Sequence, residues 1–219
     1  MNHHAIVITA KEQADLLPIE EPAALKTHEV RGNTLVTLIS PGTEIAWSYL
    51  GVQQDHAHAF PKRLGYAAVL RAEQVGSEVH DLEPGTSLLC MGNHQSYQQT
   101  EALAAVPIPP ELPAHEAVLA RLMGVTMTTL MTTSARPGDL VVVTGAGPVG
   151  YLGAHLFALS GYDVCVVEPN ERRRAGVQRS GITTVHPTMP LEDKEIKGQV
   201  ALVLECSGHE QAALDGARI

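Results

Sequence analysis

The sequence predicts an α/β fold in two parts, a mainly β part followed by part of a doubly wound parallel sheet. Three observations predict it. Short apolar runs separated by turn formers fill residues 1–112, whereas strands and helices alternate over 113–219. The segment VPIPPELP at 106–113 contains four prolines and separates these two sequence patterns. An apolar run that ends abruptly in glycines, VVVTGAGPVG at 141–150, is typical of the start of an α/β unit.

The N-terminal part is expected to consist of short strands. Its apolar runs are AIVIT (5–9), TLVTLIS (34–40), GYAAVLRAEQV (65–75) and TSLLCMG (86–92). The turn formers RGN, PGTE and EPGT punctuate them, and PGTE is interpreted as a turn. Because proline lacks a backbone N–H, residues 106–113 are expected to form neither a helix nor a strand ladder.

The C-terminal part is expected to alternate strands with helices. Strands are predicted at 140–143, 163–168, 182–187 and 200–205. Helices are predicted over 114–135, from the glycines to Gly161, and from the capping residue Asn170 to near Gly181. The apolar face of the second helix is expected to consist of residues three and four apart: Val149, Leu152, Leu156 and Leu159.

The composition excludes several functional classes. With 15 basic and 24 acidic residues, the net charge is −9, which disfavours nucleic acid as a partner. No segment has the apolar length of a membrane span, and the N-terminus lacks a signal-peptide pattern. The three cysteines, Cys90, Cys165 and Cys206, are spaced for neither a disulfide framework nor a zinc clip. These features favour a cytoplasmic protein without membrane or nucleic-acid partners.

The motif GAGPVG fits the pattern of a dinucleotide-binding loop that joins a strand to a helix. Gly145 would allow the tight turn, Gly147 the approach of a pyrophosphate, and Gly150 the close packing of helix and strand. Pro148 and Val149 would lie at the N-terminus of the helix, where free N–H groups and the helix dipole favour anions. The structural alternative is a glycine-rich turn without a ligand.

An acidic residue follows at the spacing that such loops require. Glu168 ends the second predicted strand, about 20 residues past the glycines, where a carboxylate binds a ribose hydroxyl and repels a 2′-phosphate. This favours NAD over NADP. Three arginines follow closely, at 172–174. Arg173 is taken as a cofactor-binding candidate because an arginine could bind a phosphate. The alternative is a surface glutamate.

Together these features resemble the medium-chain dehydrogenase/reductase family, which includes the zinc alcohol and polyol dehydrogenases. The segment ECSG at 205–208 also resembles the cofactor domain of that family, and it adds Ser207 to the cofactor-binding candidates. The resemblance implies a GroES-like catalytic domain over 1–112 and an NAD-binding Rossmann domain over 113–219. Since family members are longer, we expect the Rossmann domain to be its N-terminal half only, completed by missing C-terminal sequence or in a homo-oligomer.

The chain departs from the zinc-containing members at their ligand positions. Pro41 stands where those enzymes have a cysteine, and Tyr66 and Ala67 stand in the place of a histidine and a glutamate. A catalytic zinc needs about three protein ligands with N, S or O atoms. The four-cysteine structural zinc lobe is missing as well, so we expect a zinc-free member. His56 and His58, interpreted as chance surface histidines, are the alternative metal ligands.

Without zinc, side-chain donors must act on the substrate oxygen. Thr43 matches the hydroxyl residue through which the family passes a proton from a substrate alcohol, and Tyr66 could donate its O–H from the vacated histidine position. Glu44 and His94 are weaker candidates for a proton relay. Each has a structural alternative: Thr43 as a turn cap, Tyr66 as a filler of the zinc space, and the other two as ordinary structural residues.

The GTE segment also resembles the subgroup that contains the bacteriochlorophyllide hydroxyethyl dehydrogenases, which interconvert a secondary alcohol and a ketone. The expected function is therefore NAD(H)-dependent, zinc-independent oxidation or reduction of a small-molecule alcohol or carbonyl compound. Two alternatives stay open, an NADPH-dependent quinone or enone reductase and a non-catalytic dinucleotide-binding protein.

Overall fold

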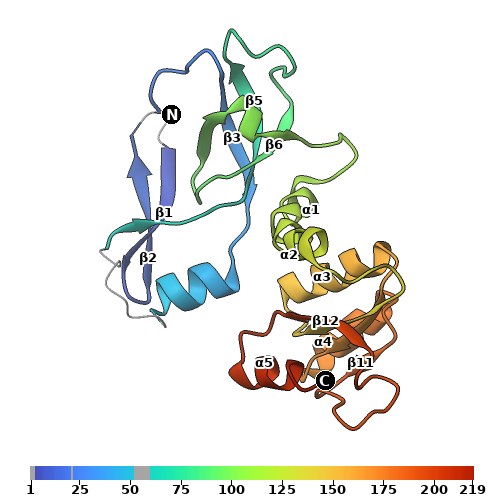
Figure 1. Cartoon of the computed structure of the whole chain (residues 1–219). Coiled ribbons are helices and arrows are strands. Elements are labelled where there is room, and N and C mark those ends of the chain that lie inside the picture. Colours follow the sequence, from blue (N-terminus) through green and yellow to red (C-terminus); the bar gives the residue numbers. More distant parts are fainter. Residues whose placement is uncertain (1–2, 21, 52–59) are drawn as a thin grey trace. The chain divides into compact units, whose positions relative to one another are not determined.

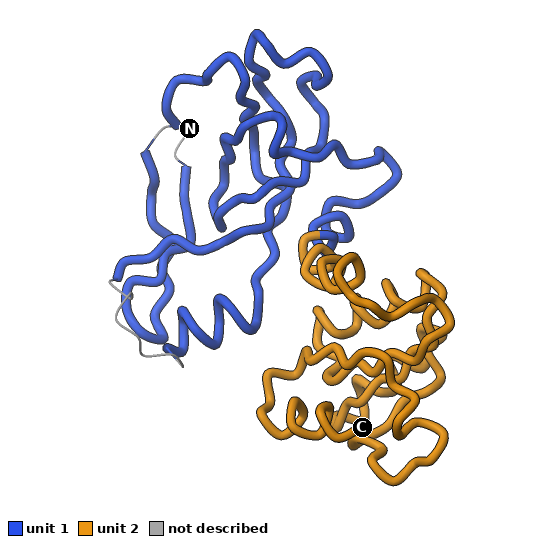
Figure 2. Tube along the Cα trace, in the orientation of Figure 1, with its two compact units in different colours: residues 1–120 blue, residues 121–219 orange. Residues whose placement is uncertain are grey.

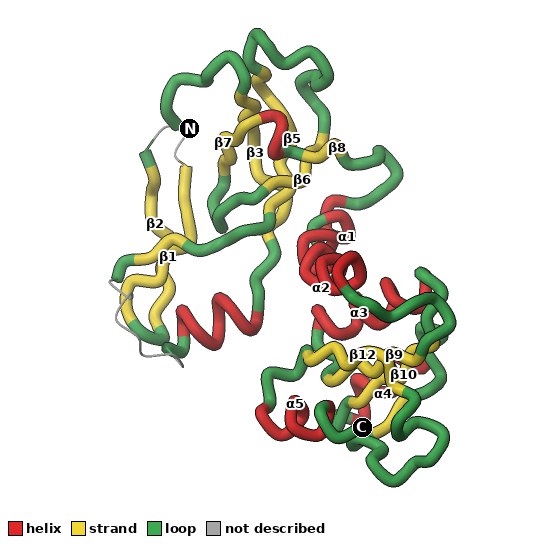
Figure 3. The backbone as a smooth tube through the Cα atoms, viewed as in Figure 1, coloured by secondary structure: helices red, strands yellow, loops and turns green. Residues whose placement is uncertain are grey.

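The computed structural model describes residues 3–20, 22–51 and 60–219. The chain forms two compact units, residues 1–120 and 121–219 (Figure 2). The division therefore lies a few residues after the predicted boundary at 112, within a helical segment. Both units have the secondary-structure content expected of them, one mainly β and the other α/β (Figure 3).

Unit 1 contains two antiparallel sheets (Figure 1). The smaller has the order β2 (Gln13–Ile19), β1 (His3–Ala10), β4 (Lys62–Arg63). The larger has the order β7 (Tyr97–Glu101), β3 (Glu29–Thr37), β5 (Ala68–Val75), β6 (Ser87–Cys90), β8 (Val106–Pro107). One face of the larger sheet buries the apolar side chains of β3, β5 and β6 around Val30, Leu70 and Leu88.

The structure corrects two predictions for this unit. Val106 and Pro107 do form a short ladder, opposite Leu89 and Leu88 of β6, because a proline at the sheet edge has no need to donate a hydrogen bond. The PGTE segment is not an isolated turn. It begins the helix η1 (Pro41–Tyr49), in which the Ile45 N–H donates to the Ser40 carbonyl five residues earlier. A single turn η2 (Ala102–Ala104) follows β7.

Unit 2 is built on a parallel sheet of order β11 (Val185–His186), β10 (Asp163–Val167), β9 (Leu140–Thr144), β12 (Val200–Glu205). The intervening helices are α3 (Pro148–Leu159) and α4 (Glu171–Arg179), and α5 (Glu210–Gly216) follows the last strand. Buried side chains on the two faces of the sheet belong to different clusters, so both faces are covered, as in a doubly wound fold.

The predicted helix over 114–135 is two helices, α1 (Ala114–Ala117) and α2 (Ala120–Thr132). The break at Val118 and Leu119 separates two packing environments. Ala117 and Val118 are buried with β5 in unit 1, whereas Leu130 of α2 packs on the core of unit 2. One continuous apolar stretch in the sequence therefore serves two cores.

The predicted apolar face of α3 is also wrong in part. Leu159 is 83% exposed, whereas the buried residues include Gly150, Gly153, Ala154 and Phe157. The helix turns its small residues to its neighbours, since a Cβ on Gly153 would lie 2.8 Å from a methyl carbon of Thr126 in α2. Close packing of backbones, not a leucine stripe, sets the orientation of this helix. Among the described residues, no helix is long and apolar enough to cross a membrane.

Candidate functional site

The glycine loop joins β9 to α3 at the carboxyl edge of the parallel sheet. Gly145 has φ +84°, and its N–H donates to the Val167 carbonyl of β10 at 2.7 Å. Gly150 lies so close that a Cβ there would come within 1.9 Å of the Gly145 carbonyl oxygen. These two glycines therefore shape the loop and its packing, as the motif predicts.

Gly147 differs from both. It is the N-cap of α3, no side chain caps the helix, and a Cβ at this position would meet nothing within 4 Å. Pro148 has no N–H, and the N–H groups of the first helical turn, Val149 and Gly150 included, have no carbonyl partner within the helix. The loop thus presents open space beside N–H groups without intrahelical partners and the positive end of a 12-residue helix.

Glu168 lies directly after β10 and is buried, with 3% of its surface exposed. Its Oε2 accepts a hydrogen bond from the Ala146 N–H at 2.7 Å, and its Oε1 accepts one from the Asn170 N–H at 2.8 Å. Arg173 places a guanidinium nitrogen 3.7 Å from Oε2. The carboxylate is therefore bound to the glycine loop itself, an arrangement that the sequence motif does not specify.

Two hollows flank the glycine loop within unit 2. One, of 360 Å³, is lined by Gly145, Ser207 and the apolar side chains Val167, Pro187 and Met189, among others. The second, of 390 Å³, is lined by Val149 of α3 and by Val125 and Thr126 of α2. The end of β12 (Leu204 and Glu205) and Cys206, which follows it, complete this lining together with Thr129 and Gly208. Chain connectivity reverses direction across the sheet between β9 and β12, where ligands of such sheets bind.

In unit 1 the predicted relay residues Glu44 and His94 are joined. His94 Nε2 lies 2.9 Å from Glu44 Oε1, and His94 Nδ1 lies 2.8 Å from the Thr37 hydroxyl. The Ser40 N–H donates to Glu44 Oε2 at 2.7 Å. Both side chains of the pair are buried. This chain of contacts fixes the start of η1 against the loop that follows β6.

The charge of the Glu44 carboxyl follows from its surroundings. Burial acts to raise the pKa of the Glu44 carboxyl, but hydrogen bonds from His94 and from the backbone of Ser40 and Gly65 outweigh it, and the pKa lies below its ordinary value. Glu44 is therefore ionised at neutral pH, and His94 donates to it through Nε2. Sequence reasoning missed Thr37 and Ser40, because nothing in their spacing shows that they meet this pair.

The two remaining catalytic candidates lie in different environments. Thr43 is exposed near the start of η1, where its N–H donates to the Ser40 hydroxyl at 3.3 Å. Tyr66 is half-buried and packs on the cluster around Ala67 and Val69. The roles assigned to these residues from the sequence remain predictions.

Two of the residues that the sequence analysis compared with zinc ligands, Pro41 and Ala67, have side chains without an N, O or S atom that could bind a metal. Pro41 is the first residue of η1, and Ala67 is fully buried in an apolar cluster. Over residues 3–20, 22–51 and 60–219, no group of three or more His, Cys, Asp or Glu side chains is placed to hold a metal ion. His56 and His58, the alternative ligands, lie outside the described residues.

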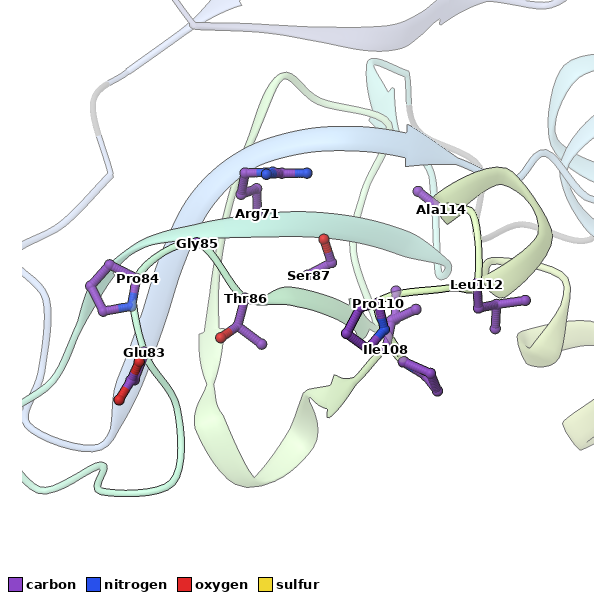
Figure 4. Close-up of a pocket in the computed structure, with 11 residues that line it drawn as sticks. Arg71, Glu83, Pro84, Gly85, Thr86, Ser87, Ile108, Pro110, Leu112 and Ala114 are labelled. Carbon is purple, nitrogen blue, oxygen red and sulfur yellow. The ribbon is translucent and has the colours of Figure 1, made fainter.

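A further hollow of 520 Å³ lies at the edge of the larger sheet in unit 1 (Figure 4). Its polar side chains come from Arg71 of β5, Glu83, Thr86 and Ser87, and the proline-rich segment around Pro110 forms part of its lining. None of the site residues predicted from the sequence lines it.

Comparison with known proteins supports the same reading of the fold. No protein-family profile matches the chain. A sorbitol dehydrogenase from Halalkalibacterium halodurans is 35% identical over 92 residues, which is 38% of this chain and 27% of that enzyme. The match therefore spans about a quarter of the length of this relative.

Solved structures match over nearly the whole chain. Galactitol-1-phosphate dehydrogenase from Escherichia coli has a TM-score of 0.84 at 17% identity, covering 98% of this chain and 71% of the enzyme. A dehydrogenase from Sinorhizobium meliloti bound to NADP has a TM-score of 0.81 at 17% identity, with coverage of 100% and 73%. An alcohol dehydrogenase from Escherichia coli complexed with NADH has a TM-score of 0.80 at 18% identity, with coverage of 98% and 73%. The resemblance to the medium-chain dehydrogenases/reductases is thereby confirmed in the fold, and the chain has the two-part fold of these enzymes.

Proposed function

We propose that this chain is part of an NAD(H)-dependent oxidoreductase that interconverts an alcohol and a ketone or aldehyde without zinc. The observation that carries the proposal is the glycine loop. It combines open space at Gly147, an uncapped helix N-terminus and a hollow on each side. This combination fits a long anionic ligand that crosses the loop with its phosphates and extends into both hollows.

Within this proposal each residue has a defined task. The N–H groups at the start of α3 hold the pyrophosphate, with Gly147 leaving room for it. The hollow lined by Val167, Pro187 and Met189 takes the adenosine end, and the hollow beside Val149 takes the nicotinamide end. The nicotinamide, when bound, supplies the hydride chemistry. Thr43 is the first candidate for moving the substrate proton, because its hydroxyl is exposed while the buried Glu44 and His94 hold its segment in place.

The preference for NAD over NADP rests on the negative charge of Glu168 beside the loop. Arg173 lies within ion-pair distance and lowers the repulsion of a 2′-phosphate, which is the observation that favours the NADPH-dependent alternative. We expect NADH to bind about tenfold more tightly than NADPH, a difference of about 1.4 kcal/mol. Titration of nicotinamide fluorescence gives both dissociation constants. Equal constants, or tighter NADPH binding, would contradict the preference.

A turnover assay separates an enzyme from a binding protein. Thr43→Val and Tyr66→Phe each remove one hydroxyl, and loss of the group that acts on the reacting oxygen should reduce turnover about 100-fold. Cofactor affinity should remain unchanged. Tyr49→Phe is a matched control, since the Tyr49 hydroxyl donates to the Glu12 carbonyl at 2.8 Å. Wild-type rates in both test variants would exclude these two residues.

The zinc prediction is tested on protein purified without an affinity tag. Pro41 and Ala67 offer no ligand atoms, so we expect no stoichiometric zinc and activity that survives a strong chelator. Atomic emission gives the metal content per chain. About one zinc per chain, with activity lost on its removal, would disprove a zinc-independent mechanism.

A further inference from the structure

The carboxylate of Glu205, the last residue of β12, joins two strands at the edge of the sheet. Its Oε1 accepts hydrogen bonds from the Ser207 N–H at 2.7 Å, from the Gly208 N–H at 3.1 Å and from the Thr144 hydroxyl at 3.2 Å. The Ser207 hydroxyl donates to the same oxygen. One side chain therefore folds the turn after β12 and ties it to the end of β9.

This turn lies directly against the glycine loop. The Cys206 N–H donates to the Thr144 carbonyl at 2.9 Å. A Cβ on Gly145 would lie 2.9 Å from the Cα of Ser207, and a Cβ on Gly150 would lie 3.1 Å from the Cβ of Cys206. With so little space between them, a displacement of the turn must displace the loop.

Residues of the turn also border both hollows beside the loop. Ser207 lines the 360 Å³ hollow, and Glu205, Cys206 and Gly208 line the 390 Å³ hollow. Burial acts to raise the pKa of the Glu205 carboxyl, yet its hydrogen bonds from Ser207, Gly208 and Thr144 outweigh burial and hold the pKa below the ordinary value. The carboxylate is thus ionised, and an ionised acceptor makes the stronger hydrogen bonds.

We propose that Glu205 is a positioning residue for the dinucleotide site: its Oε1 holds the Ser207–Gly208 turn between the two hollows and against Gly145. The inference rests on the proposed function, and it adds a residue that the glycine motif does not contain. Glu205 acts through the backbone of the turn and the loop, and its charge is needed only to strengthen the hydrogen bonds.

Two variants separate positioning from charge. Glu205→Asp keeps the charge but withdraws the oxygen by one methylene, so the turn loses its acceptor. Glu205→Gln keeps the length and can place its carbonyl oxygen at Oε1, while its NH₂ replaces Oε2, which accepts a hydrogen bond from the Gly208 N–H at 3.2 Å. We expect Glu205→Asp to weaken NADH and NADPH binding by a similar factor of about ten, and Glu205→Gln to stay within about threefold of wild type.

The measurement is NADH fluorescence titration, with thermal unfolding of each variant followed alongside. Glu192→Asp is the matched control, because Glu192 is an exposed carboxylate that lines neither hollow. Wild-type affinity in Glu205→Asp, even with a lowered melting temperature, would assign Glu205 a stabilising role alone and overturn the inference. Loss of binding in Glu205→Gln but not in Glu205→Asp would overturn it in favour of charge. A wild-type chain that binds neither dinucleotide would instead disprove the proposed function on which the inference rests.

Discussion

Substitution of Gly147 by valine tests the glycine loop most directly, because a side chain at this position would project into the space that the proposed function assigns to the pyrophosphate. The backbone there has φ −67° and ψ 178°, which valine adopts without strain, and a Cβ would meet no atom within 4 Å. Valine is a poorer N-cap than glycine, so we expect the free energy of unfolding to fall by no more than about 1 kcal/mol.

The effect on binding should be much larger. A side chain at Gly147 would occupy the space through which a phosphate approaches the N–H groups of α3. A hydrogen bond to a charged group contributes about 1.5–3 kcal/mol. Loss of one such contact should therefore increase the dissociation constant of NADH about 10- to 150-fold. The assay is NADH titration of Gly147→Val beside wild type, with unfolding by urea measured for both.

Gly176→Val provides the control for this substitution. Gly176 lies in α4, and a Cβ at this position would also meet nothing within 4 Å, so the same volume is added away from the loop. Unchanged NADH binding in Gly147→Val would refute the assignment of the loop to the pyrophosphate. A large loss of stability would refute the description of Gly147 as an open position.

Three further predictions follow from local geometry. Gly150→Ala should destabilise unit 2 by at least about 1–3 kcal/mol, because its Cβ would lie 1.9 Å from a carbonyl oxygen; an unchanged urea midpoint would contradict this. The pKa of the Glu44 carboxyl is lower in the folded chain than in the unfolded chain, where it is about 4.3. Ionised Glu44 therefore stabilises the fold above the unfolded pKa, and this stabilisation is lost as the pH falls through the folded pKa. Glu44→Gln should therefore lose less stability than wild type between about pH 6 and pH 3, and parallel pH profiles would exclude this role. Burial raises the pKa of the thiols of Cys90, Cys165 and Cys206 to about 11. At about pH 8, thiol reagents should therefore react rapidly with these cysteines only after the protein has been denatured.

Much of unit 2 could be predicted from the sequence because its signals are local. The apolar run at 200–205 predicts a strand with the bounds that β12 has, and Asn170, the predicted cap, accepts a hydrogen bond from the Arg173 N–H at the start of α4. The failures have a common cause. Apolar spacing alone does not show which neighbour each face of a helix meets. That neighbour decides whether Leu159 or Gly153 is buried and where the long helical stretch breaks.

The candidate site divides in the same way. Glycine spacing predicts the loop, because the conformation of Gly145 and the close approach at Gly150 require glycine whatever lies around them. The partners of Glu205 and of Glu44 could not be predicted, since each carboxylate meets groups from other elements. Their identification needs the register of the strands and the path of the turns.

Two carboxylates hold the glycine loop, one from each neighbouring strand. Glu168 from the β10 side binds the Ala146 N–H, and Glu205 from the β12 side binds the Thr144 hydroxyl. Carboxylates so close to a pyrophosphate site would oppose an anion if their charges were unscreened. Each charge, however, is already engaged by backbone donors, and Arg173 stands beside Glu168. The N–H groups at the start of α3 have no partner within the helix, and in the proposed function they would donate to the phosphates while the internal acceptors hold the loop.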